Sequence, residues 1–144
     1  MRGSALSAKV SAFLETFSRW AGSQPDVTAI VLVGSYARGT ASEGSDVDLV
    51  ILTSDVHRYF RDRSWVSLFG EVAEYREEDY GRLTSLRAFY GGGLEVEYGF
   101  STPDWATVPI DAGTLRVVKD GVKVLHDPRG IIGGMQREIE SSGD

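Results

Sequence analysis

Two short apolar runs constrain the fold of this chain more than any other feature of its sequence. Val27 to Val33 and Leu49 to Leu52 are rich in β-branched residues, and a segment rich in glycine, serine and threonine separates them. Runs of this length and composition are typical of buried strands. Because both faces of the second strand are apolar beyond Asp48, we expect residues 46–53 to lie centrally in a sheet.

The rest of the chain alternates between helical and strand periodicity. Apolar residues recur at helical spacing over 5–21, which predicts an amphipathic helix. Further expected elements are a short helix at 35–38, a broken helical segment at 54–70, strands at 71–79, 83–90 and 94–100, a helix at 111–120 and a strand at 122–125. The polar, glycine-containing residues 129–144 are expected to form a flexible tail or a frayed helix. The pattern predicts a single domain over 1–144 of the α/β (α+β) class, with a mixed β-sheet flanked by helices.

Composition narrows the classes of function. The chain has 144 residues and no cysteine, which suits one core in a reducing compartment and excludes disulfides. A formal net charge of −6 argues against a DNA duplex as an obligate partner, because phosphate contacts need a basic face. No apolar run approaches a membrane span and no signal-peptide pattern is present, so no membrane partner is expected and the cytoplasm is the expected location.

The segment between the two apolar runs contains the side chains that could bind a metal ion or phosphate. Asp46 and Asp48 are two residues apart on a predicted strand, so their side chains point to one face, with Cα atoms roughly 6.5 Å apart. Two ionised carboxylates so close repel each other, which favours a cation between them or a proton on one. Oxygen ligands favour a hard ion, Mg²⁺ first and Mn²⁺ second. Gly34 and Ser35 follow the first strand, where backbone N–H groups and a hydroxyl can bind phosphate.

A third carboxylate would complete a site for two metal ions. Glu97 is the best candidate, with Glu95 on the same face of the strand over 94–100 as the alternative third ligand or as a general base. This assignment requires that strand to lie beside the strand of Asp46 and Asp48.

The charged run from Tyr75 to Arg82 is interpreted as a solvated sheet edge, and Trp105 as an anchor in or near the core.

These residues together resemble a known signature. Gly34-Ser35-Tyr36-Ala37-Arg38-Gly39, followed by Ser45-Asp46-Val47-Asp48-Leu49, is similar to the motif of the DNA polymerase beta-like nucleotidyltransferase superfamily, in its small bacterial branch of minimal and aminoglycoside nucleotidyltransferases. The strict match covers about 20 residues, and the pattern of elements extends over 27–100.

The resemblance implies a Mg²⁺-dependent transfer of a nucleoside monophosphate from an NTP, with ATP as the expected donor, to a hydroxyl acceptor. It assigns phosphate binding to Gly34 and Ser35, with Ser45 in the same loop, and metal binding to Asp46, Asp48 and a third acidic residue. Arg38 matches the motif arginine, and is expected either to contact phosphate or to pair with a carboxylate that holds the loop.

The identity of the acceptor stays open, as a small molecule or a partner protein, and a homodimer is one way to complete its site. Two alternatives to the enzyme are retained from the same family. One is an antitoxin that pairs with a small helical toxin, and the other is a catalytically inactive nucleotide-binding module.

Overall fold

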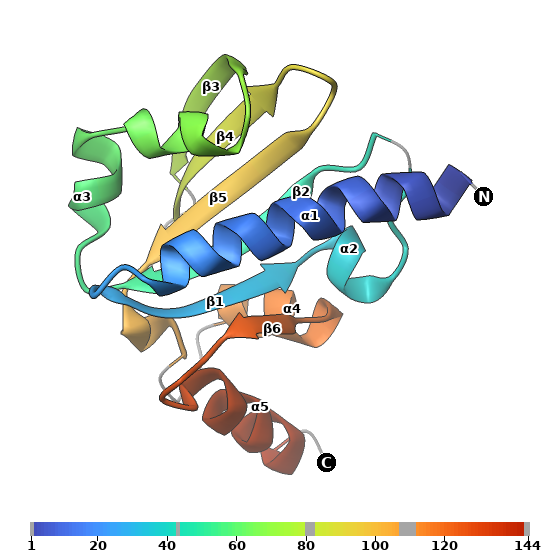
Figure 1. Ribbon diagram of the computed structural model, residues 1–144. Coiled ribbons are helices and arrows are strands. Elements are labelled where there is room, and N and C mark those ends of the chain that lie inside the picture. The colour runs from blue at the N-terminus through green and yellow to red at the C-terminus, as the bar shows by residue number, and fades with distance from the viewer. Residues whose placement is uncertain (1, 43, 80–82, 107–111, 143–144) are drawn as a thin grey trace.

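The computed structural model describes residues 2–42, 44–79, 83–106 and 112–142. Figure 1 shows a twisted sheet with helices on both sides. The helices are α1 (Arg2–Gly22), α2 (Ser35–Arg38), α3 (Val56–Arg61), α4 (Ala112–Asp120) and α5 (Ile131–Ser142), with 3-10 turns η1 (Ser64–Phe69) and η2 (Pro103–Ala106). The strands are β1 (Val27–Val33), β2 (Val47–Thr53), β3 (Val72–Asp79), β4 (Thr84–Tyr90), β5 (Glu95–Ser101) and β6 (Lys123–His126).

The strands form one mixed sheet in the order β3-β4-β5-β2-β1-β6. β2 pairs in parallel with β5 and antiparallel with β1, and the remaining neighbours are antiparallel. The predicted α+β class and mixed sheet are therefore confirmed. β2 is an internal strand, as the apolar character of both its faces predicted, because an internal strand with helices on either side has no face left for solvent.

One face of the sheet is covered by α1, α3 and η1. Alternate residues of the strands, such as Leu49 and Tyr98, pack there against Phe17 of α1 and Trp65 of η1, and these side chains are at most 7 % exposed. Phe17 and Tyr98 have ring centroids 5.2 Å apart. The apolar side of α1 is therefore buried against the apolar face of the sheet, and this burial stabilises the helix at this position.

A second core lies on the opposite face, where Val31 and Leu52 of the strands contact η2, α4 and α5. Trp105 of η2 is 1 % exposed and belongs to this core, as its interpretation as an anchor predicted. Of the two alternatives expected for 129–144, a flexible tail or a helix, residues 131–142 adopt the helix. They form α5, in which Ile132 and Met135 are buried, because these two residues and Ile139 share one helical face. Residues 143 and 144 lie outside the described part.

Candidate active site at the start of β2

The start of β2 brings three carboxyl groups together. Asp46 directly precedes the strand and Asp48 is its second residue, and both lie on the face opposite α1 because side chains alternate along a strand. In the parallel pairing of β2 with β5, Asp48 is the register partner of Glu97. One ligand oxygen from each of Asp46, Asp48 and Glu97 lies within 4.8 Å of the others. We call these three residues the carboxylate triad.

Gly34 connects the triad to the loop that follows β1. Val33, the last residue of β1, is the register partner of Asp48, so the chain leaves β1 directly beside the triad. Gly34 has φ 75° and ψ −157°, a region that is essentially restricted to glycine. A Cβ at this position would lie 2.3 Å from Oδ2 of Asp48, which is a severe overlap. Glycine at position 34 is therefore required both by backbone conformation and by the approach of the Asp48 carboxyl group.

The other predicted binding residues occupy three different settings. Ser35 begins α2, where the helix geometry leaves backbone N–H groups without partners inside the helix. Arg38 ends α2 and is exposed, and its Cγ would lie 3.3 Å from a Cβ at Gly121. The hydroxyl of Ser45 accepts a hydrogen bond from the backbone N–H of Ser42 at 2.9 Å, so this side chain closes the loop before β2. Their roles in nucleotide binding stay predictions.

Arg87 on β4 is the residue that the sequence reasoning missed. Its Nη1 donates to Oδ2 of Asp46 at 3.1 Å and to Oε2 of Glu95 at 2.5 Å, and its Nη2 donates to Oε2 of Glu97 at 2.5 Å. Its Nε donates to Oε1 of Glu78 at 3.1 Å. The sequence held one signal for it, since Arg87 is the single charged residue in the strand TSLRAFY. Arg87, the triad, Glu78 and Glu95 are called the Arg87 cluster below.

The two glutamates of β5 have different surroundings. Glu97 lies beside Asp48, belongs to the triad and has a side chain that is 17 % exposed. Glu95 is 31 % exposed and bonds to Arg87, and it lies outside the group of three. Between the two alternatives, the geometry favours Glu97 as the third carboxylate. The described part of the run interpreted as a solvated edge lies mostly exposed in the edge strand β3, as expected, and Glu78 is the exception because it contacts Arg87. Residues 80–82 of that run lie outside the described part.

The electrostatics of the triad are those of a site that favours additional positive charge. Burial, a hydrogen bond with Asp46 and the negative charges of Asp46 and Glu97 raise the pKa of Asp48 from 3.8 to about 8. Burial also raises the pKa of Glu97, although the charge of Arg87 opposes it. Burial and the charge of Asp46 raise the pKa of Tyr36 in α2. The donors are all carboxylate oxygens, which fit a hard divalent cation such as Mg²⁺ or Mn²⁺.

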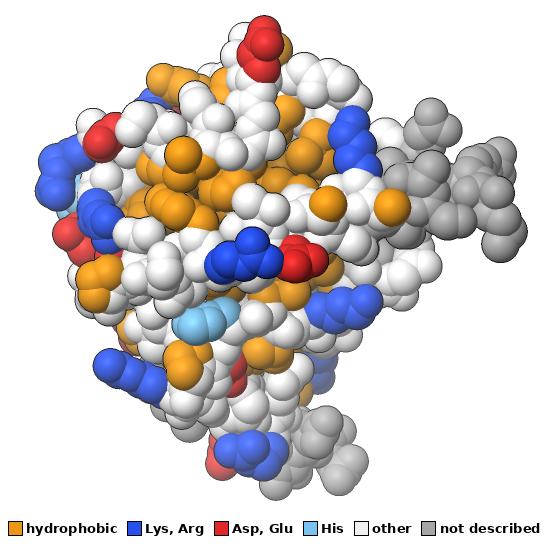
Figure 2. All heavy atoms as spheres, viewed as in Figure 1, with side chains coloured by type: hydrophobic (Ala, Val, Ile, Leu, Met, Phe, Trp, Pro, Cys, Tyr) orange, Lys and Arg blue, Asp and Glu red, His pale blue; other side chains and the backbone are white. Residues whose placement is uncertain are grey.

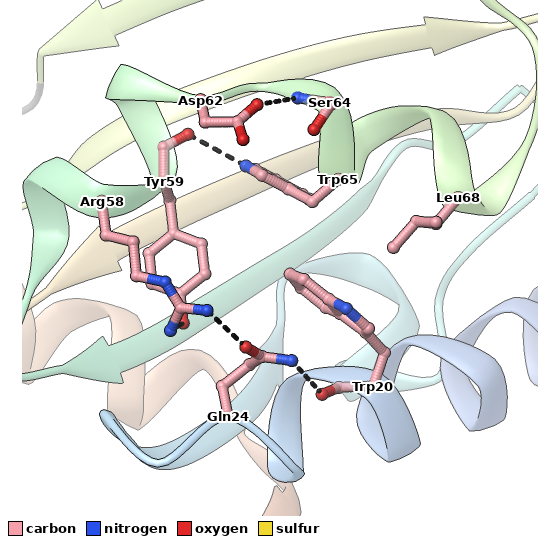
Figure 3. A pocket seen from close by; sticks show the side chains of 8 residues that line it. All are labelled: Trp20, Gln24, Arg58, Tyr59, Asp62, Ser64, Trp65 and Leu68. Atoms are coloured by element: carbon pink, nitrogen blue, oxygen red, sulfur yellow. Dashed lines mark hydrogen bonds between the residues drawn. The ribbon is translucent and has the colours of Figure 1, made fainter.

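A hollow of about 300 Å³ lies on the α1 face of the sheet, at the end of α1. Figure 2 shows hydrophobic side chains gathered between α1 and the η1 region, and Figure 3 shows the lining residues at close range. Trp20, Trp65 and Leu68 line it together with polar groups that bond to protein atoms. Nη2 of Arg58 donates to Gln24 at 2.7 Å, and Nε1 of Trp65 donates to the carbonyl of Tyr59 at 2.9 Å. Since these groups already have partners, the hollow is a weaker candidate site than the triad.

Among the residues that the structure describes, no helix has both the length and the apolar character that a membrane span needs.

Comparison with known sequences connects this site to one family. The model of the nucleotidyltransferase domain matches residues 11–91, which include α1 from residue 11 onward, the Gly34-Ser35 loop, the Asp46–Asp48 pair and Arg87, whereas Glu97 lies beyond the match. A protein of Methanocaldococcus jannaschii, whose name gives protein adenylyltransferase as its proposed activity, is 50 % identical over 38 residues. That match covers 26 % of this chain and 26 % of the relative, so it spans about a quarter of each protein.

Solved structures share the fold. An aminoglycoside 6-adenyltransferase from Bacillus subtilis aligns with a TM-score of 0.50 and 14 % identity, over 62 % of this chain and 34 % of that chain. The polymerase core of TRAMP, an RNA surveillance complex, aligns with a TM-score of 0.51 and 16 % identity, over 97 % of this chain and 42 % of that chain. At these identities the likeness shows the fold alone. With more than half of its length matched by the family model, and with the corresponding sheet and helices, this chain belongs to the nucleotidyltransferase domain family.

Proposed function

We propose that this chain transfers a nucleoside monophosphate from an NTP to an acceptor hydroxyl and releases pyrophosphate. The observation that carries the proposal is the triad. Asp46, Asp48 and Glu97 come from two strands that are distant in sequence, and the parallel pairing of β2 with β5 sets them side by side next to Gly34. Three carboxylates at this separation repel one another and lower the stability of the fold, so a functional role such as metal binding accounts for their arrangement.

In this proposal, the residues of the triad hold Mg²⁺ or Mn²⁺. When bound, such an ion neutralises charge on the phosphates and on the attacking and leaving oxygens. Backbone N–H groups at Gly34 and Ser35 bind the triphosphate, and the missing side chain at position 34 lets phosphate oxygens approach the backbone. The acceptor hydroxyl loses its proton to solvent and its oxygen bonds to the α-phosphorus, while the bond from that phosphorus to the oxygen that bridges to the β-phosphorus breaks and pyrophosphate leaves with the electron pair.

The proposed donor is ATP and the proposed acceptor is a hydroxyl group of a protein side chain. The support for both is the name of the Methanocaldococcus jannaschii relative, a protein adenylyltransferase, over a segment 50 % identical to this chain. The adduct that forms identifies which protein carries that hydroxyl, the chain itself or a partner, and an adduct on a small molecule would contradict this choice of acceptor. The antitoxin alternative rests on the family resemblance alone and has no separate observation in its favour.

The test is an adduct assay by mass spectrometry. The chain is incubated with Mg²⁺, each NTP in turn and a panel of acceptors that includes the chain itself, candidate partner proteins and aminoglycosides. We expect one AMP adduct with ATP and none with EDTA. Asp48→Asn should lower the rate by more than about 100-fold, beyond what residues outside the metal ligands usually contribute.

Glu15→Gln is the matched control, because Glu15 lies on α1 with a side chain that is 73 % exposed. It should leave the rate unchanged. Absence of any adduct, together with absence of NTP binding by calorimetry, contradicts the proposal, as does an Asp48→Asn variant that is as active as the natural chain.

A further inference from the structure

Arg87 holds an unusual position relative to the triad. Its guanidinium bonds directly to two of the three carboxyl groups, those of Asp46 and Glu97. It also bonds to Glu78 and Glu95, so one cation contacts four carboxylates and lies close to a fifth, that of Asp48. The oxygens that would bind a metal ion therefore belong to groups that already share a cation.

We propose that the guanidinium of Arg87 is a built-in counter-cation that weakens the hold of the triad on a divalent metal ion. The inference rests on the proposed function in one respect, namely that the triad binds such an ion. Beyond the proposed function, it states that Arg87 is a positioning residue that also lowers the affinity of the triad for the ion. It keeps the repelling carboxylates together when no ion is bound, and it repels the ion when one arrives.

Geometry explains why an arginine rather than a lysine occupies this place. Three nitrogens of one planar group serve four carboxylates, with Nη1 shared between Asp46 and Glu95. The Arg87 side chain is 20 % exposed and that of Glu97 is 17 % exposed, so solvent and salt screen their interaction only in part. The charge of Arg87 is therefore felt by any ion at the triad.

The balance of charge supports the same conclusion. With all groups ionised, the described residues of the Arg87 cluster comprise five carboxylates and one guanidinium, so this arginine reduces the repulsion among them without cancelling it. A divalent ion can still bind, but against the repulsion of a fixed positive charge a few ångströms away. Removing that charge should strengthen metal binding, even though it removes hydrogen bonds from two ligands.

The experiment measures Mn²⁺ binding to the full chain by isothermal titration calorimetry, without nucleotide. We expect R87Q to bind Mn²⁺ about tenfold more tightly than the natural chain, the order expected for loss of one nearby charge in a partly exposed site. R87K keeps the charge and should stay within about threefold of the natural affinity. Unchanged or weaker binding by an R87Q chain that is folded without metal overturns the inference, and so does R87K binding as tightly as R87Q.

R76Q is the matched control. Arg76 is the register partner of Arg87 on β3, but its side chain is 60 % exposed and pairs with Glu74 at 3.4 Å. Loss of this arginine should leave the Mn²⁺ affinity unchanged. A tightening equal to that of R87Q would show a general effect of net charge and would overturn the inference.

R87Q could unfold without metal because the carboxylates repel one another. In that case Mn²⁺ should refold it, as followed by far-ultraviolet circular dichroism, because the ion then supplies the missing charge. An R87Q chain that stays unfolded at saturating Mn²⁺ overturns the inference. If the natural chain binds no Mn²⁺ at all, the metal premise of the proposed function fails. If the natural chain binds Mn²⁺ and R87Q binds it no better, only the inference fails.

Discussion

Among the described arginines that bond to carboxylates, Arg58 and Arg87 have surroundings that differ in one decisive respect. Arg58 of α3 bonds to the single carboxylate of Asp26, at the entry to β1. Arg87 of β4 bonds to four carboxylates at the start of β2. The first cluster is balanced in charge and the second has an excess of negative charge.

The Arg58 cluster is a closed network. Asp26 accepts hydrogen bonds from Thr53 at 2.5 Å and from the hydroxyl of Tyr59 at 2.7 Å, and it pairs with Arg58. Burial acts to raise the pKa of Asp26, but the hydrogen bonds from Thr53 and Tyr59 and the charge of Arg58 outweigh it, so that the pKa is lowered. Every member thus stabilises the ionised carboxylate, which is what a structural tie between α3 and the sheet requires.

The Arg87 cluster is organised in the opposite sense. Burial and neighbouring carboxylates raise the pKa of Asp48 to about 8, even with Arg87 nearby. A balanced cluster contributes to the stability of the fold, whereas a cluster with excess negative charge lowers stability until a cation binds. The comparison teaches that charge balance separates the structural tie from the candidate active site, although both contain an arginine and carboxylates.

The largest expected effect on stability comes from opening the balanced cluster. Asp26→Ala leaves Arg58, Thr53 and Tyr59 without their shared acceptor, so the free energy of unfolding should fall by about 3 kcal/mol. Transferase activity per folded molecule should not change. Urea denaturation measures the first quantity and the adduct assay the second. A marked loss of activity in the folded variant would break the assignment of this cluster to structure alone.

A smaller effect is expected from Gly34→Ala, which disturbs the triad without altering its charge. The backbone strain at φ 75° should lower the free energy of unfolding by about 2 kcal/mol. Because a Cβ would displace the carboxyl group of Asp48, activity should fall by more than about tenfold. Gly93→Ala is the control, since position 93 also has positive φ, 92°, but no atom lies near its Cβ position. It should lose stability and keep activity.

The smallest effect expected is a difference in pH dependence between the two clusters. Asp48 has a folded pKa of about 8 against an ordinary value of 3.8, so the metal-free fold binds the extra proton and loses stability as pH rises through this range. Asp26 has a lowered pKa, so its contribution is present above its ordinary pKa and is lost as pH falls.

Melting temperatures of the metal-free chain, Asp48→Asn and Asp26→Asn between about pH 2 and pH 9 test this contrast, because the loss of the Asp26 contribution falls below its ordinary pKa. Asp48→Asn should flatten the decline of stability toward alkaline pH, and saturating Mg²⁺ should do the same. Asp26→Asn should flatten the decline toward acid. Parallel curves for all three proteins would show that the two carboxylates are not in opposite environments.

Much of the fold and two of the three triad residues could be predicted from local signals in the sequence. The apolar runs predicted β1 and β2, and the periodicity over 5–21 predicted α1. Asp46 and Asp48 were identified from their two-residue spacing and from the glycine-containing loop before them. The structure explains the glycine at position 34 of that loop, because the carboxyl group of Asp48 leaves no room there for a Cβ. Side-chain alternation on a strand follows from backbone geometry alone, so no tertiary information was needed.

The tertiary structure decided which residues meet across the sheet. Glu97 takes its place beside Asp48 only because β2 pairs in parallel with β5, and Arg87 reaches the triad only because β4 pairs with β5 in the register that places it opposite Glu97. The burial of Ile132 and Met135 in α5 likewise depends on a sheet face formed by distant residues. Local sequence was enough to identify the carboxylates of Asp46 and Asp48. Their neighbours Glu97 and Arg87 depend on the order and register of the strands, which are set by long-range pairing.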